Sequence, residues 1–314
     1  MSSKRKIAII GVGHVGSTTA YTVAMQGLVD ELVLIDTNEK KAEGEAFDIE
    51  DARAGLPVQL KVHINDYAQT TDCEIAVISA GPLPRPDQSR LDTLGDGVKI
   101  IDDIVPHLLG NGFKGIIVDI SNPCDVMTHY LWKKTGFPVN RVFGTGTGLD
   151  SLRLRSIVGK VFTIAPESVE GYVLGEHGDS QIVPWSQVRV RGKTVPELIA
   201  DNEKYRQIDL TQLASQISYR GWAVLLSKGS TMYGIATATA AIIRAVLNDE
   251  NRILPVSAAL SGEYGQRGLH IGVPAVIGRN GIRDIIELHL NDEEASGFAH
   301  SADVIKSYIA KIGV

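Results

Sequence analysis

Residues 7–16 read IAIIGVGHVG, an apolar run that leads into the glycine pattern GxGxxG at Gly11, Gly13 and Gly16. In a strand–turn–helix unit the first glycine permits a tight turn and the second lets the backbone approach a pyrophosphate. The third lets the helix pack closely on the sheet. The pyrophosphate then lies at the helix amino terminus, where free N–H groups point at it. This stretch predicts a dinucleotide-binding domain.

A second apolar run, residues 32–35, ends on Asp36. A carboxylate at the end of the second strand can accept hydrogen bonds from the 2′- and 3′-hydroxyls of an adenosine ribose. Its charge would repel the 2′-phosphate of NADP. The sequence therefore predicts NAD as the cofactor.

The bulk composition limits the classes of function. The 314 residues, 44% of them hydrophobic, are enough for two lobes with a full core. No apolar stretch reaches the ~20 residues of a membrane span, and residues 4–6 (KRK) lead into a strand rather than a signal-peptide core. We therefore expect a cytoplasmic protein without a membrane partner. The net charge of −6 disfavours a nucleic-acid partner.

The two cysteines, Cys73 and Cys124, form no disulfide framework and have no neighbours with the spacing of a zinc site. We interpret both as packing residues and expect no metal site. Small molecules are the partners that remain.

Strands and helices alternate along the first half of the chain. Besides the two strands above, we predict strands at residues 58–62, 75–79, 116–120 and 141–143, with helices at 40–53, 91–109 and 125–134. This alternation predicts an α/β fold, a Rossmann-type doubly wound parallel sheet. We place the dinucleotide-binding domain at residues 1–145.

The second half has a different pattern. We predict strands at residues 169–174, 182–190, 252–260 and 270–277, and longer helices at 208–226 and 232–247. Residues 146–314 are therefore expected to form a mixed α+β substrate and catalytic domain. Near the end, Asn291 and Glu294 match a capping box. The helical stripe that follows is core or subunit contact, and its members are Phe298, Ala302, Ile305, Ile309 and Ile312.

Three segments carry residues suited to chemistry on a carbonyl. Residues 175–179 (GEHGD) place His177 between glycines, and an imidazole exchanges protons near neutral pH. If a helix starts near Leu149, Asp150 and Arg153 lie on one of its faces. Arg153 can then grip a carboxylate with two hydrogen bonds, although a local ion pair is an equally good interpretation. The proline-rich loop 81–90, which ends in arginine, could act as a lid.

Together these segments resemble the L-lactate and malate dehydrogenase family over nearly the whole chain. The motifs that carry the resemblance occur in the family's order: GVGHVG with Asp36, the loop from Ser79-Ala80-Gly81 to Ser89-Arg90, residues 120–123 (ISNP), residues 149–153 (LDxxR), residues 175–179 (GEHGD) and residues 228–231 (KGST).

The resemblance implies a role for each site residue. His177 looks like the acid/base residue, Asp150 like its orienting carboxylate and Arg90 like a lid arginine that polarises the substrate carbonyl. The implied substrate-binding residues are Arg153, Asn122, Thr231, Pro84 and Leu83. The implied cofactor-binding residues are Gly11, Gly13, His14, Val15, Gly16, Asp36, Ser79, Ala80, Gly81 and Asn122. The substrate would be a 2-oxo or 2-hydroxy acid, and the protein a homo-oligomer, either a dimer or a tetramer.

Two departures bear on the substrate. Pro84 stands where the malate enzymes carry a lid arginine, so a second carboxylate would be buried without a partner. Residues 168–177, with residues 220–222 (RGW), resemble L-2-hydroxyisocaproate dehydrogenases, and Gly221 would leave space for a branched side chain. We therefore expect a 2-oxoisocaproate-like substrate. The lid differs in length from those enzymes, so L-lactate dehydrogenase acting on pyruvate is the alternative, with malate dehydrogenase less favoured.

Two other classes are open at this point. Tyr130 and Lys134 have the Tyr-x-x-x-Lys spacing of short-chain dehydrogenases, but that class has a different glycine spacing. A protein that binds NAD without catalysing a reaction is the other alternative, and the presence of four residues together argues against it: His177, Asp150, Arg153 and Arg90. The resemblance also bears on regulation. Arg155 matches one arm of the fructose 1,6-bisphosphate site of some relatives, whereas Glu170 replaces the histidine of the other arm.

Overall fold

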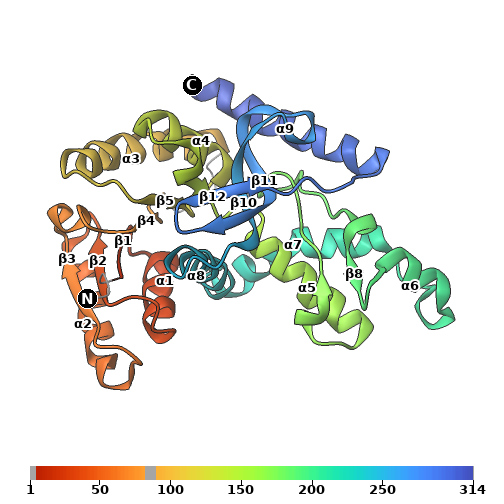
Figure 1. Ribbon diagram of the computed structural model, residues 1–314, viewed down its shortest axis with the longest axis horizontal. Helices are drawn as coiled ribbons and strands as arrows, with labels where there is room; N and C mark the ends of the chain where they lie inside the picture. The colour runs from red at the N-terminus through yellow and green to blue at the C-terminus, as the bar shows by residue number, and fades with distance from the viewer. Residues whose placement is uncertain (1–4, 82–89, 314) are drawn as a thin grey trace.

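The computed structural model describes residues 5–81 and 90–313, and the side chains of residues 90–92 lie outside this description. In the described part, six parallel strands form one half of a nine-stranded sheet, in the order β3-β2-β1-β4-β5-β6 (Figure 1). Their bounds are β1 Lys6–Ile10, β2 Glu31–Ile35, β3 Lys61–Ile64, β4 Ile75–Ile78, β5 Ile116–Asp119 and β6 Val142–Gly144. The strand order reverses between β1 and β4, and ligands of such sheets bind at the carboxyl ends of the strands beside that point.

Helices cover both faces of this half of the sheet, so its central strands are buried. Figure 1 shows α1 and α2 on one side and α3 and α4 on the other. The bounds are α1 His14–Met25, α2 Glu39–Asp51, α3 Arg90–Gly110 and α4 Cys124–Thr135. In β1, β2, β4 and β5 every residue is buried, which explains why they are apolar apart from the terminal Lys6, Glu31 and Asp119. The predicted α/β, doubly wound parallel fold is confirmed.

The second half extends the same sheet with antiparallel strands. Ser257 of β10 pairs with Gly144 of β6, and β11 and β12 follow outward. The further bounds are β10 Arg252–Ser261, β11 Arg267–Gly278 and β12 Gly281–Ile285, with a small separate sheet of β7 Val169–Glu170, β8 Arg189–Val190 and β9 Lys193–Thr194. The helices are α5 Gly148–Phe162, α6 Val195–Asp201, α7 Leu210–Lys228, α8 Tyr233–Leu247 and α9 Asp292–Ile312.

Short 3₁₀ helices connect several of these elements: η1 Ala52–Gly55, η2 Tyr67–Thr70, η3 Val139–Arg141, η4 Pro166–Ser168, η5 Trp185–Gln187, η6 Glu203–Tyr205 and η7 Glu263–Gly265. Three predicted strands need correction. The strand expected at residues 182–190 is replaced by η5 and the two-residue β8, because Pro184 has no N–H for a ladder. Of the strand predicted at residues 169–174, the structure has only the two residues of β7, Val169–Glu170. The strand at 58–62 begins later, at Lys61, because the chain turns after Pro57.

Helix α9 packs as the sequence predicted. Asn291 and Glu294 form a capping box, and the first four residues of the predicted apolar stripe are buried in the main core. Ile312 is half-buried against that core. A second, smaller core lies between α5, α7 and the small sheet and includes Leu154, Val188 and Ile217. Among the described helices we find none with the length and apolarity of a membrane crossing.

Candidate active site

The glycine-rich turn after β1 lies against the end of β4. Gly11 has a φ of +90°, and a Cβ built on it would lie 2.6 Å from the backbone nitrogen of Ala80. A Cβ on Gly16 would collide with the carbonyl oxygen of Gly11 and approach Ser79 Oγ to 3.2 Å. Both positions therefore require glycine, one for the turn and one for the helix contact.

The amino terminus of α1 is suited to an anion. Gly13 is its N-cap, and within the described residues no side chain caps it and no acidic residue occupies its first turn. A Cβ on Gly13 would meet nothing within 4 Å, so the space in front of His14 and Val15 is open. The first N–H groups of a helix lack internal partners, and these can bind a pyrophosphate.

Asp36 is fixed beside this turn. Its carboxylate accepts hydrogen bonds from the backbone N–H groups of Val12 and Asn38, each at 2.9 Å, and its own N–H donates to Asn65 Oδ1 at 2.9 Å. Each carboxylate oxygen accepts more than one hydrogen bond, so both can still receive a ribose hydroxyl. The turn, the open helix end and the acid fit NAD.

The ends of β4 and β5 meet at the next part of the cleft. A Cβ on Gly81 would lie 3.8 Å from the Cβ of Ser121, and Ser121 precedes the exposed Asn122. Asp119, at the end of β5, is buried and accepts from Ser121 Oγ at 2.5 Å and Thr128 Oγ1 at 3.1 Å. Burial raises the pKa of Asp119 to about 7 despite these hydrogen bonds. This network holds the loop that carries Asn122.

His177, Asp150 and Arg153 form one chain of contacts. His177 Nδ1 lies 2.6 Å from Asp150 Oδ2, and Arg153 donates from Nη1 to Asp150 Oδ1 at 2.8 Å. The Asp150 side chain is 3% exposed, whereas that of His177 is 24% exposed. Asp150 and Arg153 lie in the first turns of α5, one helical turn apart as the sequence predicted. A buried carboxylate thus supports an imidazole that reaches the solvent.

The charges in this chain favour the protonated imidazole. Burial alone would lower the pKa of His177, but the charge of Asp150 and its hydrogen bond outweigh burial, so the pKa lies above 6.5. Burial alone would raise the pKa of Asp150, but the charges of His177 and Arg153 hold it below its usual value. Asp150 is therefore an ionised acceptor, and His177 donates from Nδ1, which leaves Nε2 free for proton exchange.

The loop that carries His177 is held from two other elements, and sequence reasoning missed these residues. Asp125 of α4 accepts from the backbone N–H of His177 at 2.8 Å and from Ser257 Oγ of β10 at 2.5 Å. Ser301 of α9 accepts from the backbone N–H of Glu176 at 2.7 Å. These partners lie far away in the sequence. In the sequence, Asp125 could be noticed as the acidic residue three places after Asn122, but nothing there indicates its partners.

Helix α7 forms a wall beside Arg153. A Cβ on Gly221 would lie 3.2 Å from Nη2 and 3.3 Å from Nη1 of Arg153. The structure therefore does not support the expectation that Gly221 leaves space for a branched substrate, because the guanidinium lies where the first atom of a side chain would be. The glycine instead allows the helix to approach the arginine.

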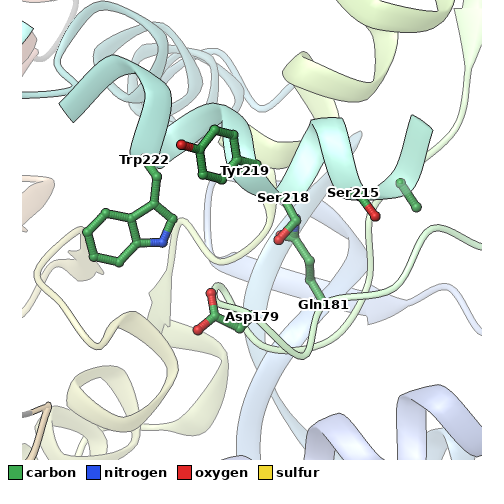
Figure 2. Close-up of a pocket in the computed structure, with 7 residues that line it drawn as sticks. Asp179, Gln181, Ser215, Ser218, Tyr219 and Trp222 are labelled. Carbon is green, nitrogen blue, oxygen red and sulfur yellow. The ribbon is translucent and has the colours of Figure 1, made fainter. Parts of the chain in front are cut away.

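An open pocket of about 600 Å³ lies along the same helix. Figure 2 shows Asp179 and Gln181, on the loop after His177, opposite Ser218 and Trp222 of α7. The other lining residues are Ala214, Ser215 and Tyr219. Asp179, one of the lining residues, lies two positions after His177 in the sequence.

Some predicted residues are not brought into this arrangement. Leu83 and Pro84 lie outside the described residues, and Arg90 is the first residue of α3, with its side chain outside the description. Thr231 is half-buried in the turn between α7 and α8. Within the described ranges no group of His, Cys, Asp and Glu side chains could hold a metal ion.

Comparisons with known proteins match both halves of the chain. Residues 5–144 match the family profile described as the lactate/malate dehydrogenase NAD binding domain. Residues 147–313 match the lactate/malate dehydrogenase alpha/beta C-terminal domain. The chain is 46% identical over 310 residues to L-lactate dehydrogenase 3 of Bacillus thuringiensis subsp. konkukian, with 98% of each chain covered. It is 42% identical over 310 residues to L-lactate dehydrogenase 2 of Lactococcus lactis subsp. lactis, with 99% of each covered.

Solved structures give the same result. The minor L-lactate dehydrogenase from Enterococcus mundtii, in its ligands-bound form, matches with a TM-score of 0.95 and 38% identity over 99% of both chains. A lactate dehydrogenase from a Medee basin deep-sea metagenome library matches with a TM-score of 0.96 and 35% identity, again over 99% of both chains.

Proposed function

This chain belongs to the lactate/malate dehydrogenase family, and we propose that it is an L-lactate dehydrogenase that interconverts pyruvate and L-lactate. It is an NAD-dependent oxidoreductase that acts on a CH–OH donor. The observation that carries the proposal is the series of hydrogen bonds that connects His177 through the buried Asp150 to Arg153. A proton donor and a carboxylate-binding cation beside a dinucleotide site suit the reduction of a 2-oxo acid.

In the proposed reaction, bound NADH supplies a hydride to the carbonyl carbon of pyruvate. Negative charge then grows on the carbonyl oxygen, and protonated His177 donates its Nε2 proton to that oxygen. The product hydroxyl contains this proton, and neutral His177 takes it back when lactate is oxidised. The raised pKa of His177 supports this role, because the Asp150 carboxylate that raises it favours the protonated, proton-donating form of the imidazole.

Asp150 has two effects on this step. Its Oδ2 holds His177 Nδ1 at 2.6 Å, which fixes the ring with Nε2 directed away from α5. Its charge also stabilises the imidazolium form. Because the Asp150 side chain is 3% exposed, water screens this interaction little.

Arg153 is the proposed partner of the substrate carboxylate. One of its N–H groups is held by Asp150 Oδ1 at 2.8 Å, which fixes the plane of the guanidinium. The remaining N–H groups can bind a carboxylate through two parallel hydrogen bonds. Gly221 on α7 leaves room for the guanidinium, because a Cβ at this position would press on both terminal nitrogens.

Pyruvate replaces 2-oxoisocaproate as the proposed substrate for two reasons. The relatives reported above are named L-lactate dehydrogenases, and the space expected at Gly221 is filled by Arg153. A larger side chain would gain ~0.8 kcal/mol for each buried methylene only if the pocket admitted it. We keep the expectation that dicarboxylates are poor substrates, since it depends on Pro84.

The test is a panel of 2-oxo acids assayed by loss of NADH absorbance. We expect kcat/KM to be highest for pyruvate, lower for 2-oxoisocaproate and lowest for oxaloacetate. A higher kcat/KM for 2-oxoisocaproate than for pyruvate would restore the first preference, and oxaloacetate as the best substrate would indicate a malate dehydrogenase.

We also propose that the chain works as a homo-oligomer, a dimer or a tetramer. Support comes from α7, where Tyr219, Trp222 and Leu226 lie on one helical face and are 58%, 51% and 74% exposed. An apolar face of this kind is typical of a subunit contact. Light scattering should give a mass at least twice that of one chain, and a monomeric mass at micromolar concentration would refute the proposal.

A further inference from the structure

Asp125 connects three segments that are distant in the sequence. It is the second residue of α4, and its side chain is buried. One carboxylate oxygen accepts the backbone N–H of His177 at 2.8 Å, and the other accepts Ser257 Oγ of β10 at 2.5 Å. The carboxylate therefore ties the His177 loop to a helix of the first half and to the central sheet.

Asp125 lies in the same short segment as Asn122, so its contacts connect that segment to the His177 loop. Asn122, which the family resemblance assigns to both cofactor and substrate binding, lies three residues before Asp125. The loop between them leads directly into α4. The same short segment therefore carries Asn122, which is assigned to cofactor binding, and Asp125, which holds the proton donor His177. The hydride from the cofactor and the proton from His177 must reach adjacent atoms of one carbonyl. The distance between the cofactor and His177 therefore affects the rate.

We propose that Asp125 is a positioning residue that holds His177 at a fixed position relative to the loop of Asn122. This inference rests on the proposed function, in which His177 exchanges the proton. Asp125 touches the backbone of His177 and not its ring, so it acts through His177 rather than on the substrate.

The charges around His177 come from three elements. Asp150 and Arg153 face it from α5, Asp125 faces it from α4, and Glu176 precedes it on its own loop. Burial raises the pKa of Asp125 to about 6, although the hydrogen bonds from Ser257 and His177 oppose this. At neutral pH Asp125 is therefore mostly ionised, and its charge favours the protonated form of His177, as does that of Asp150.

Two substitutions of Asp125 distinguish the effect of its hydrogen bonds from the effect of its negative charge. In Asp125→Asn the amide oxygen can still accept the His177 N–H while the amide nitrogen donates to Ser257, because a hydroxyl can also accept. This variant removes the charge and retains both contacts. In Asp125→Ala both contacts are lost.

Glu294 offers a matched control at a distance from the site. Its carboxylate also accepts a backbone N–H and a serine hydroxyl, those of Ser186 at 2.9 and 2.6 Å, and in addition the backbone N–H of Asn291 at 3.1 Å. Glu294→Gln and Glu294→Ala therefore impose the same chemical changes on the same kind of contact. We expect both control variants to retain kcat and the pH profile of the parent enzyme.

The experiment measures kcat, KM for pyruvate and NADH, and the pH profile, together with the pKa of the His177 ring by NMR of labelled histidine in the ligand-free protein. For Asp125→Ala we expect kcat to fall about tenfold to a hundredfold, with KM for NADH within about threefold. For Asp125→Asn we expect a smaller loss of kcat and a His177 pKa lower by roughly half a unit or more.

His177→Asn serves as the reference that separates the two hypotheses. If His177→Asn retains turnover, the proposed function fails whatever Asp125 does. If His177→Asn loses turnover but Asp125→Ala keeps kcat within about threefold of the parent, the positioning role is wrong. Should Asp125→Ala fail to fold, Asp125→Ser decides, because it also removes the carboxylate oxygen that accepts the His177 N–H. A kcat of Asp125→Ser within about threefold of the parent would overturn the inference, and so would a loss of kcat in Asp125→Asn, which retains both contacts, as large as that in Asp125→Ser.

Discussion

The imidazole of His177 combines partial exposure with a buried ionic partner. Its side chain is 24% exposed, and the Asp150 side chain beneath it is 3% exposed. An exposed ion pair contributes little because water screens it, whereas this pair is screened on one side only. The geometry therefore stabilises the positive charge of the ring and leaves Nε2 accessible to a substrate.

The first prediction concerns the proton donor itself. His177→Asn removes the exchangeable proton but leaves the glycine turn and Asp36 unchanged. We expect turnover to fall by about 10²–10⁴-fold, with NADH affinity nearly intact. Stopped-flow assays and a fluorescence titration of NADH measure the two quantities. Turnover within tenfold of the parent enzyme would remove His177 from the catalytic role.

The pH dependence follows from the raised pKa of His177. Pyruvate reduction needs the protonated ring, so its kcat/KM should be constant at low pH and fall as the pH rises through a value above 6.5. Lactate oxidation needs the neutral ring and should show the opposite dependence. Profiles of both directions from pH 5.5 to 10 test this. A midpoint at or below 6.5 for the reduction would contradict the assigned charge environment.

Arg153→Lys should chiefly weaken substrate binding. A lysine keeps the positive charge but cannot form the planar two-point contact, and it loses the orientation that Asp150 gives the guanidinium. We expect KM for pyruvate to rise about tenfold to a hundredfold, while the affinity for NADH stays constant. Steady-state kinetics at saturating NADH provide the measurement. An unchanged KM would place Arg153 outside the substrate site.

The sequence predicted the ionic chain at this scale but not its supports. His177, Asp150 and Arg153 occur in short motifs whose side-chain chemistry suits the reaction. Asp125 gives no such signal, because a carboxylate in the first turn of a helix is typical of any helix start. Its partner is a backbone N–H 52 positions later in the chain, and every residue except proline has such a group.

Among the elements, the buried strands were predicted best. Strands covered on both faces are continuous apolar runs, and their limits agree with the structure within one or two residues at β4, β5 and β6. Residues 182–190 were predicted wrongly, because an apolar segment that packs on a core as a loop has a similar composition. The structure there depends on contacts with Leu174 and with α9.

The contact between α4 and β11 gives a prediction about acid stability. His129 Nδ1 and His270 Nδ1 lie 3.2 Å apart in a buried site, and His270 Nε2 lies 3.3 Å from the Val142 carbonyl. Because His270 donates to that carbonyl, its Nδ1 accepts the proton of His129. Burial, assisted by Lys133, lowers the pKa of His129 to about 4, and burial with the charge of His129 lowers that of His270 to about 3.

Both rings are therefore neutral in the folded protein at pH values where they are protonated in the unfolded chain. Their contribution to stability is complete above pH 6.5 and is lost as the pH falls toward 4 and then 3, by up to about 1.4 kcal/mol per pH unit for each ring. His129→Asn should reduce the slope of the unfolding free energy against pH between pH 6.5 and 4.5 by about 1.4 kcal/mol per pH unit, the contribution of one proton. Urea unfolding across this range measures the slope, and equal slopes for parent and variant would show that the pair does not control it.

At the scale of the whole molecule, the site is assembled across the two halves of the chain. One sheet runs from β3 to β12, and Asp125 of the first half contacts His177 and Ser257 of the second. The division into residues 1–145 and 146–314 remains our proposal for two domains. The sequence could predict the two halves from their strand and helix patterns, but contacts between them depend on three-dimensional packing that no local pattern encodes.

The last prediction concerns regulation by fructose 1,6-bisphosphate. In relatives activated by fructose 1,6-bisphosphate, an arginine and a histidine form the anion site, and here the corresponding residues are Arg155 and Glu170. Arg155 lies on α5 with its guanidinium 5.7 Å from the ring centre of Tyr172, and its buried Nε has no hydrogen-bond partner among the described residues. Glu170 is exposed in β7.

A carboxylate in place of the histidine repels a bisphosphate, so Glu170 would oppose the attraction of the anion to Arg155. We expect KM for pyruvate to be unchanged when fructose 1,6-bisphosphate is added at millimolar concentration. Glu170→His should restore one cationic arm and produce a measurable, saturable decrease in KM, whereas Glu167→His, on the exposed turn just before β7, should not. A saturable decrease of KM in the parent enzyme would show that Glu170 does not block the site.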